Sequence, residues 1–295
     1  AKPVIMSIMP EGDDLHKIKT AFVTERGEIP EIYCILETYV KNRRGKLELW
    51  NALSIHTKEW DEKEIGSVTY NYCKNWRFDY GKAKDMQRFI DSLTTVFAFQ
   101  PLEIEYFMAE DWETMQKARG FEYFLGMGNY PHPAGYADVS NKMVYTGGMG
   151  EYYPHEVARL YLEHNFPNSN CMFIFGMATV LGGCRGETFQ WHLDKVAKYI
   201  ENHPNEQIFN TQAKGDQDVV LNIRYIDDMT NPGYVIGGVF CKMALEQGGI
   251  EKLKKLLSYG TGCEDFYTGV KAEFGIPREE LNNYMRNEIE KRTSK

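Results

Sequence analysis

The sequence is poor in several features that would assign it to a common protein class. Its 295 residues contain no apolar run near the roughly 20 that a membrane-spanning helix needs, so we expect no membrane-embedded segment. Basic residues are in the minority, with 34 Lys and Arg against 42 Asp and Glu and a formal net charge of −8. A chain of this charge is not expected to have nucleic acid as its main partner.

Motifs of several large enzyme classes are missing as well. There is no Walker-type phosphate loop, no G-x-G-x-x-G after a strand and no G-x-S-x-G turn. These absences argue against a nucleotide-dependent enzyme or a serine hydrolase of those types. Internal repeats and low-complexity linkers are also missing, so we expect the parts of the chain to pack closely.

Cysteine is sparse and is not arranged in close pairs. The six cysteines are Cys34, Cys73, Cys171, Cys184, Cys241 and Cys263, and none belongs to a C-x-x-C motif. If one helix carries Cys171 and Cys184, the two lie about 20 Å apart, beyond the roughly 7 Å over which a disulfide forms. Buried free thiols, or one or two disulfides in an exported protein, are the two alternatives.

The first residues, Ala1-Lys2-Pro3, include no initiator methionine and no hydrophobic leader. We expect an exported protein, either periplasmic, on the cell surface or extracellular, from which a signal segment has been removed. A trimmed cytoplasmic chain is the alternative.

The sequence does contain enough apolar material for a large core, with 43% hydrophobic and 14% aromatic residues. Residues 46–55 alternate as a half-buried strand, which we expect to pair with residues 31–40 across a turn at 42–45. Residues 82–99 have helical spacing, and residues 102–108 alternate as another strand. The expected buried face of that helix consists of Met86, Phe89, Ile90, Leu93, Val96 and Phe97.

From residue 151 onward the pattern is mainly helical. We expect helices over 151–164, 172–181, 187–202 and 232–248, and a last helix that begins at Pro277. The sequence therefore predicts an α+β fold with a helical C-terminal part.

One short segment carries most of the chemical information. Residues 153–160 read Y-P-H-E-V-A-R-L and contain H-E-V-A-R, a near copy of the zinc helix H-E-x-x-H. In that motif, histidines at positions i and i+4 bind one metal ion and the glutamate activates a bound water. Here Arg159 stands at the second histidine position. Its guanidinium has no lone pair and is permanently charged, so Arg159 cannot be a metal ligand.

A second segment lies downstream, where residues 172–183 read M-F-I-F-G-M-A-T-V-L-G-G. Together the two segments resemble the signatures of the gluzincin metallopeptidases, in particular the peptidase MA-like family, whose second signature reads roughly W-x-x-E-G-x-A-x-y-x-g-g. The alignment places Phe173 near the aromatic position, Gly176 on a small residue, and Phe175 on the glutamate that is the family's third zinc ligand. A less specific similarity extends over about Leu102 to Arg292.

The resemblance implies a zincin-like α+β fold. It implies an N-terminal α+β lobe, residues 1–166, with a mixed β-sheet and the metal-type helix, then a helical C-terminal lobe, residues 167–295, with a cleft between them. Residues 135–145 resemble the family's strand before the metal helix, which lines the substrate cleft in active members. On this basis Tyr136 and Asp138 are expected to be binding residues.

The resemblance also implies that the family's metal site is lost here. Of its three ligands only His155 is retained, beside the general-base position Glu156, so neither a metal nor another cofactor is expected. The other donors near the two helices are His164, His192, Glu163 and Glu187. Glu163 lies about 12 Å along the helix axis from His155, too far to share one zinc ion. A zinc site rebuilt from His192 and Glu187 stays open as an alternative.

The spacing predicts what takes the place of the metal. Glu156 and Arg159 are three residues apart on one helix, so the guanidinium can pair with the carboxylate and supply the positive charge. Phe175 would close the third-ligand space with an apolar ring. The alternative is an ordinary exposed ion pair worth under about 1 kcal/mol.

Two functions follow from this interpretation. We expect a catalytically inactive, metallopeptidase-like protein, a pseudopeptidase, that binds a peptide, glycan or protein in the cleft. The expected binding residues are His155, Arg159, Phe175, Tyr136 and Asp138. The alternative is an active hydrolase with a rebuilt or metal-free site, in which Glu156 is the general base and Arg159 stabilises the oxyanion.

Overall fold

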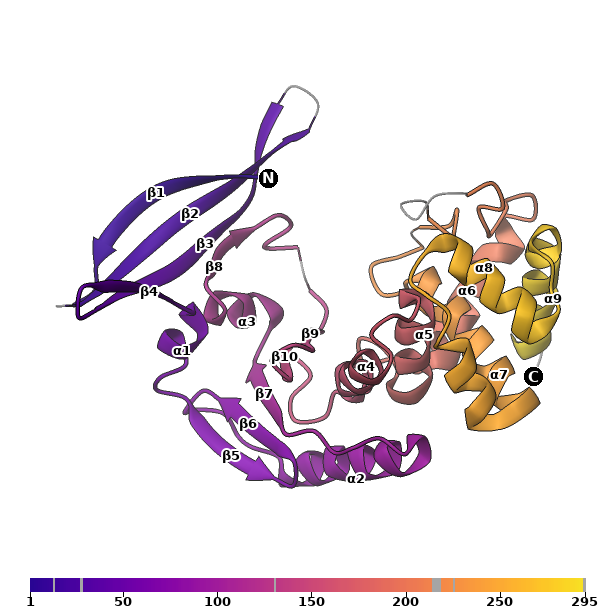
Figure 1. The fold of residues 1–295 in the computed structure, drawn as a ribbon, viewed down its shortest axis with the longest axis horizontal. Coiled ribbons are helices and arrows are strands. Elements are labelled where there is room, and N and C mark those ends of the chain that lie inside the picture. The colour runs from indigo at the N-terminus through magenta and orange to yellow at the C-terminus, as the bar shows by residue number, and fades with distance from the viewer. Residues whose placement is uncertain (13, 27–28, 130, 214–218, 225, 294–295) are drawn as a thin grey trace. The chain divides into compact units, whose positions relative to one another are not determined.

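The computed structural model describes residues 1–12, 14–26, 29–129, 131–213, 219–224 and 226–293. It has an α+β fold, as predicted, with the strands in the N-terminal half and the C-terminal half built of helices (Figure 1). The described residues fall into two compact units. The first unit comprises Ala1–Tyr80, Ile104–Tyr136 and Tyr145–Glu151, and the second comprises Gly81–Glu103, Ala137–Val144 and Tyr152–Lys295.

The first sheet consists of long antiparallel strands in the order β1-β2-β3-β4, and a short strand, β8, also pairs with β3 (Figure 1). The strands are β1 (Lys2–Pro10), β2 (Leu15–Arg26), β3 (Ile29–Arg43), β4 (Lys46–Trp50) and β8 (Phe121–Phe124). The predicted hairpin is confirmed at its turn, because β3 and β4 are joined by the two-residue turn Arg44-Gly45, in which both residues have positive φ. The predicted partner segment, 31–40, was wrong for the most part, since β4 pairs with residues 39–43. Such turns match the twist of antiparallel strands.

The predicted strand over residues 46–55 was wrong in its second half. Strand β4 ends at Trp50 because the side chain of Asn51 accepts a hydrogen bond from the Leu53 amide and thereby begins a helix, α1 (Ala52–His56). The strand is also not half-buried, since Leu47 and Leu49 are 75% and 78% exposed. The alternation of apolar and polar residues therefore gave a wrong prediction of which side chains of this strand are buried.

The second sheet has the strand order β5-β6-β7-β10-β9. Its strands are β5 (Asp61–Ile65), β6 (Val68–Tyr72), β7 (Ile104–Ala109), β9 (Ala134–Asp138) and β10 (Met143–Gly147). Strand β7 confirms the strand predicted at 102–108 and runs parallel to β6. The segment 135–145, which resembled a single strand, contains two strands and the turn between them.

The chain passes from β6 to β7 through α2 (Tyr80–Phe97), the helix predicted at 82–99. Its buried side chains are those of Ala83, Met86, Ile90, Leu93 and Phe97. Val96, predicted to be in the core, is 57% exposed, and Phe89 is half-buried. The buried stripe is therefore narrower than the predicted one. A short helix, α3 (Trp112–Ala118), follows β7.

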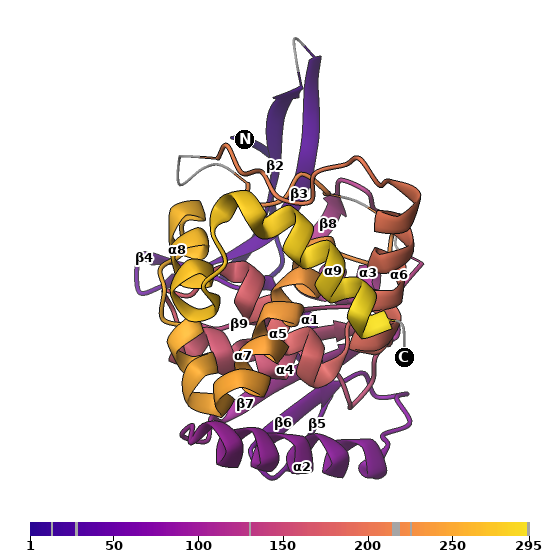
Figure 2. The same cartoon turned by 90° about the vertical axis from the view of Figure 1, so that its right-hand side faces the viewer.

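The remaining helices belong to the second unit (Figure 2). They are α4 (Pro154–Asn165), α5 (Cys171–Gly182), α6 (Phe189–Asn202), α7 (Pro232–Leu256), α8 (Cys263–Phe274) and α9 (Leu281–Thr293). The predicted helices correspond to α4, α5, α6, α7 and α9, and α8 was not predicted. Two predicted starts were wrong: α4 begins at Pro154 and not at 151, and α9 begins at Leu281, because Pro277 instead precedes a short 3-10 helix, Arg278–Glu280. Helix α7 bends at Gly248 and Gly249, near the predicted end of that helix, and continues to Leu256. The predicted lobe boundary at residue 166 stays a prediction.

Glycines set how closely α5 packs against its neighbours. A Cβ atom on Gly176 would collide with the backbone of Gly237 and Gly238 in α7. At the other end of α5, a Cβ atom on Gly182 would meet the His155 backbone nitrogen at 2.5 Å. Helix α5 therefore contacts both α4 and α7 backbone to backbone, which only glycine permits.

None of the six cysteines, all of which lie in the described ranges, forms a disulfide. Among the residues that the structure describes, no helix is both long and apolar enough to cross a membrane.

The close approach of α5 and α7 gives a stability prediction. Replacing Gly176 with alanine should lower the free energy of unfolding by about 3 kcal/mol, because the added methyl group has to push two helix backbones apart. Val180→Ala is the control: this half-exposed residue of the same helix also faces α7, but the change removes atoms instead of adding them and should cost about 1 kcal/mol or less. Urea unfolding followed by circular dichroism measures both, and equal losses would contradict the packing described.

Candidate functional site

The degenerate zinc motif lies in the first two turns of α4. Pro154 occupies the first helical position, where its missing N–H costs no hydrogen bond. His155 and Glu156 follow and are buried, with exposed fractions of 1% and 5%. A buried glutamate in the first turn benefits from the positive end of the helix dipole.

The His155 ring faces the C-terminal end of α5. Its Nδ1 atom lies 2.7 Å from the carbonyl oxygen of Gly183, and a second backbone carbonyl, that of Ala178, is also a hydrogen-bond partner. Burial lowers the pKa of His155 to about 4, more than these two carbonyls raise it. The imidazole is therefore neutral near pH 7, and we infer that its single proton is on Nδ1, since a carbonyl only accepts.

Glu156 is held from two directions. Its Oε2 atom lies 3.3 Å from Nη1 of Arg159, and the backbone N–H of Ala137 in β9 is a hydrogen-bond donor to the carboxylate. Burial raises the pKa of Glu156 to about 7, although Arg159 and the Ala137 amide both act to lower it. This carboxyl group therefore changes charge near neutral pH.

Arg159 lies between two carboxylates of its own helix and against an aromatic ring. Besides Glu156, its Nε atom donates to Oε1 of Glu163 at 2.7 Å, and its Cζ atom lies 4.5 Å from the centre of the Phe175 ring. Burial alone would lower the pKa of Arg159, but Glu156 and Glu163 raise it above its usual value. The side chain is only 15% exposed, so this is not an ordinary surface ion pair.

Phe175, at the position aligned with the third zinc ligand, packs on an aromatic residue that the sequence patterns did not indicate. The Tyr234 ring in α7 stacks on Phe175 with a centroid distance of 4.7 Å and an interplanar angle of 7°. It also lies 5.9 Å from the His155 ring. Tyr234 follows Pro232 in the first turn of its helix, and no motif marks that position as part of a site.

The four predicted residues His155, Glu156, Arg159 and Phe175 therefore form one cluster within the second unit. Asp138 has a local role, since its carboxylate accepts hydrogen bonds from the backbone and side chain of Asn141 in the turn after β9. Tyr136 belongs to the first unit, where it stacks on Tyr145 at 6.3 Å and contacts the Arg119 guanidinium. The expected binding roles of Tyr136 and Asp138 stay predictions.

The residues considered for a rebuilt zinc site have other partners or positions. His192 is buried, with Nε2 3.0 Å from the Cys184 carbonyl and Nδ1 3.2 Å from the Thr230 hydroxyl. His164 is exposed at the end of α4. Among the described residues, no group of three or more His, Cys, Asp or Glu side chains is arranged to hold a metal ion.

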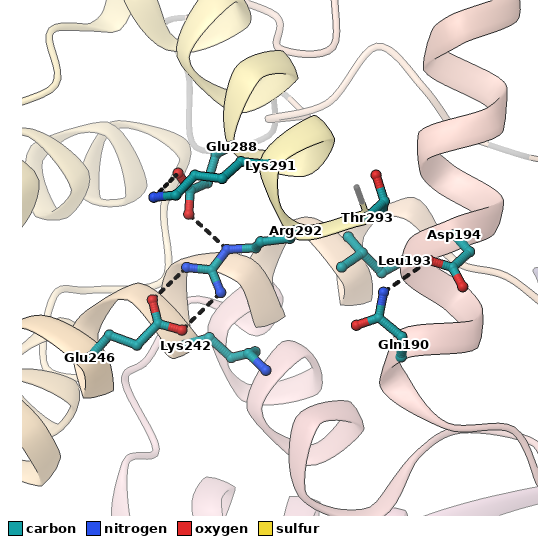
Figure 3. Close-up of a pocket in the computed structure, with 9 residues that line it drawn as sticks. All are labelled: Gln190, Leu193, Asp194, Lys242, Glu246, Glu288, Lys291, Arg292 and Thr293. Atoms are coloured by element: carbon teal, nitrogen blue, oxygen red, sulfur yellow. Dashed lines mark hydrogen bonds and ion pairs between the residues drawn. The ribbon is translucent and has the colours of Figure 1, made fainter. Parts of the chain in front are cut away.

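A separate cavity of about 650 Å³ lies among α6, α7 and α9 (Figure 3). Arg292 projects into it and binds Glu246 through two hydrogen bonds, of 2.9 and 2.6 Å, and Glu288 through one of 2.7 Å. Gln190 and Asp194 on α6 bond to each other at 2.9 Å. These charged groups pair within the wall of the cavity and connect α7 to α9, which is a structural role.

No family model matches this sequence, and a comparison with curated proteins finds no match either. The resemblance to the gluzincins therefore rests on the two sequence motifs alone.

The buried Glu156 gives a pH dependence that a single variant can isolate. Because its pKa is about 7 in the folded protein against an ordinary 4.5, protonation favours folding, and the stability that it contributes is lost as the pH rises from about 4.5 to 7. Relative to Glu156→Gln, the wild-type free energy of unfolding should fall by about 3 kcal/mol over that range. Both proteins retain His155, whose lowered pKa gives the opposite slope, so the difference between them reports Glu156. Denaturant unfolding at several pH values measures it, and a constant difference would show that Glu156 ionises normally.

Proposed function

We propose that this protein is a pseudopeptidase, a metallopeptidase-like chain in which a guanidinium has replaced the catalytic metal ion. The observation that carries the proposal is the position of Arg159, bonded to Glu156 and Glu163 and lying over Phe175. The resemblance assigns Glu156 to the general base and assigns Arg159 and Phe175 to two of the three ligand positions.

The chemistry of these groups supports loss of metal binding. A guanidinium has no lone pair and repels a divalent cation, and a phenyl ring has no donor atom. The remaining ligand position, His155, is buried, and its Nδ1 atom is engaged by the Gly183 carbonyl at 2.7 Å. A lone imidazole so engaged is far from the three protein ligands that a catalytic zinc site requires.

On this proposal the protein no longer turns over a substrate and instead binds a ligand. We propose a peptide, a glycan or a partner protein as the ligand class, as expected for a chain related to peptidases. The buried Glu156 supports binding over hydrolysis, because a general base must reach a water molecule and a substrate, and this carboxylate is only 5% exposed.

Restoring the missing donors tests the proposed origin of the site. The double variant Arg159→His, Phe175→Glu should bind about one zinc ion per chain, because it restores the two donors that the resemblance assigns to these positions, beside His155 on α4 and on α5. Zinc content after dialysis, measured by mass spectrometry, is the readout.

The matched control is Arg159→Gln, Phe175→Leu, which removes the same cation and ring without adding ligands. It should bind no more zinc than the wild type. A folded ligand-restoring variant that takes up no zinc would mean that this helix pair does not have gluzincin geometry.

One observation favours the alternative, an active hydrolase without a metal ion. The pKa of Glu156, near 7, is suited to a general base at neutral pH, and Arg159 beside it could stabilise an oxyanion. On our proposal, the wild type and Glu156→Gln should show the same background rate on a mixed fluorogenic peptide library, with and without a chelator. A wild-type rate at least tenfold above that of the variant would establish the hydrolase, and sensitivity to chelator would assign it a metal ion.

A further inference from the structure

A pocket of about 530 Å³ lies in the first unit, away from the degenerate motif in sequence. Its walls come from β3, α1, α3 and β8, and its size is within the range of roughly 300–1,000 Å³ for small-molecule sites. The residues that the argument uses are Glu37, His56, Trp60, Thr114, Phe121 and Glu122.

A close backbone contact fixes the shape of this pocket. Gly120, between α3 and β8, has φ of 96°, and a Cβ atom there would lie 2.6 Å from the Glu37 carbonyl oxygen and 2.7 Å from the Ala52 Cβ. The Gly120 carbonyl also accepts a hydrogen bond of 2.7 Å from the Glu37 amide. Only glycine permits this contact, which holds α3 and β8 against β3 and α1.

Two aromatic side chains, Trp60 and Phe121, give the pocket its apolar surface. Both are half-buried, so part of each ring is in contact with the rest of the protein and part is exposed. Trp60 is held by the Phe107 ring at 6.5 Å. A rigid, partly exposed aromatic surface beside polar groups suits a ligand that has both an apolar face and hydrogen-bonding groups.

The two carboxylates of the pocket are already neutralised by neighbouring cations. Glu37 lies 3.5 Å from Lys19 and 3.8 Å from Lys17, and Glu122 lies 2.6 Å from Lys19. Lys117 also lines the pocket, so a cationic ligand would meet its ammonium group and an anionic ligand would meet the carboxylates. The charge arrangement therefore favours a neutral ligand.

Hydrogen-bonding groups surround the aromatic surface. The imidazole of His56 is fixed, with Nδ1 3.0 Å from the Lys117 carbonyl and Nε2 2.9 Å from the Tyr39 hydroxyl. Thr114, Glu37 and Glu122 also line the pocket, and their side chains have a hydroxyl and carboxylate oxygens of the kind that bind ligand hydroxyl groups.

We propose that this pocket binds a neutral sugar. A pyranose ring places its C–H face on an aromatic side chain and offers hydroxyl groups all around its edge, each of which needs a polar partner when it leaves water. Trp60 and Phe121 supply the aromatic surface, and Thr114, Glu37 and Glu122 supply partners. The pocket lies within the first unit and includes no residue of α4. The sugar-binding proposal is therefore tested independently of the proposed pseudopeptidase.

Saturation-transfer NMR on the full chain tests the proposal with defined probes. The neutral probes are glucose, galactose, mannose, N-acetylglucosamine and their β1,4-linked disaccharides, and the charged probes are tetramethylammonium and glucuronate. At least one neutral sugar should receive saturation, and Trp60→Ala should weaken its binding at least tenfold. Thr114→Val, which keeps the shape of the side chain, should weaken it about threefold or more.

Trp191→Ala removes a tryptophan on α6, in the other unit, and should leave sugar binding unchanged. Trp60→Phe, which keeps an aromatic ring, should retain most of the affinity and guards against a folding defect in Trp60→Ala. The proposal is overturned if no neutral sugar receives saturation, if binding survives Trp60→Ala, or if a charged probe binds through Trp60 instead.

Discussion

The Arg159 guanidinium lies between two carboxylates of its own helix, 3.3 Å from Glu156 and 2.7 Å from Glu163. The cluster of His155, Glu156, Arg159 and Phe175 depends on these two ion pairs. A cation 15% exposed and a carboxylate 6% exposed would each be costly to bury alone, and pairing offsets that cost. Because Glu163 also accepts a hydrogen bond from the guanidinium, Arg159 keeps an ionised carboxylate as a partner even when Glu156 takes up a proton near pH 7.

The second constraint is the close packing of α5, and it accounts for part of the resemblance to the metallopeptidases. Gly176 is required by α7, and Gly182 is required by the start of α4, whatever the protein does chemically. Gly183 ends the helix with φ of 69° and presents its carbonyl oxygen to His155. The glycines of the second motif are therefore explained by packing, whereas a buried His-Glu pair next to a cation has no such explanation.

The sequence allowed six of the helices to be predicted because several of their ends are encoded locally, whereas α1, α3 and α8 were not predicted. Pro154 and Pro232 begin α4 and α7, and the glycines after Leu181 end α5. Strand burial was harder to predict, since Leu47 and Leu49 alternate correctly and still face solvent. The long strands β1 and β2 were not predicted at all, because β1 has the run V-I-M-S-I-M without alternation and is exposed over most of its length.

Local sequence patterns predicted a contact between two residues of the candidate site only where both lie on the same helix. The spacing of Glu156 and Arg159 fixes their contact, because both are on α4. The position of Phe175 beside Arg159 came from the alignment to a known motif. Tyr234 is 59 residues further along the chain than Phe175 and joins the cluster only through the packing of α5 on α7, which no local pattern encodes.

The same cluster explains why a single substitution would not create a metal site. Replacing Arg159 alone would leave Glu156 buried beside the carboxylate of Glu163 without the cation that both contact. The pKa of Glu156, already raised to about 7 with the guanidinium present, would rise further, and taking up a proton is an easier response than binding a divalent ion with too few ligands. Phe175 would still face that space with a ring that donates no electron pair. Arg159 and Phe175 pack on each other, so replacing one of them leaves the other in place of a ligand. A metal ion could bind here only if both residues were replaced together.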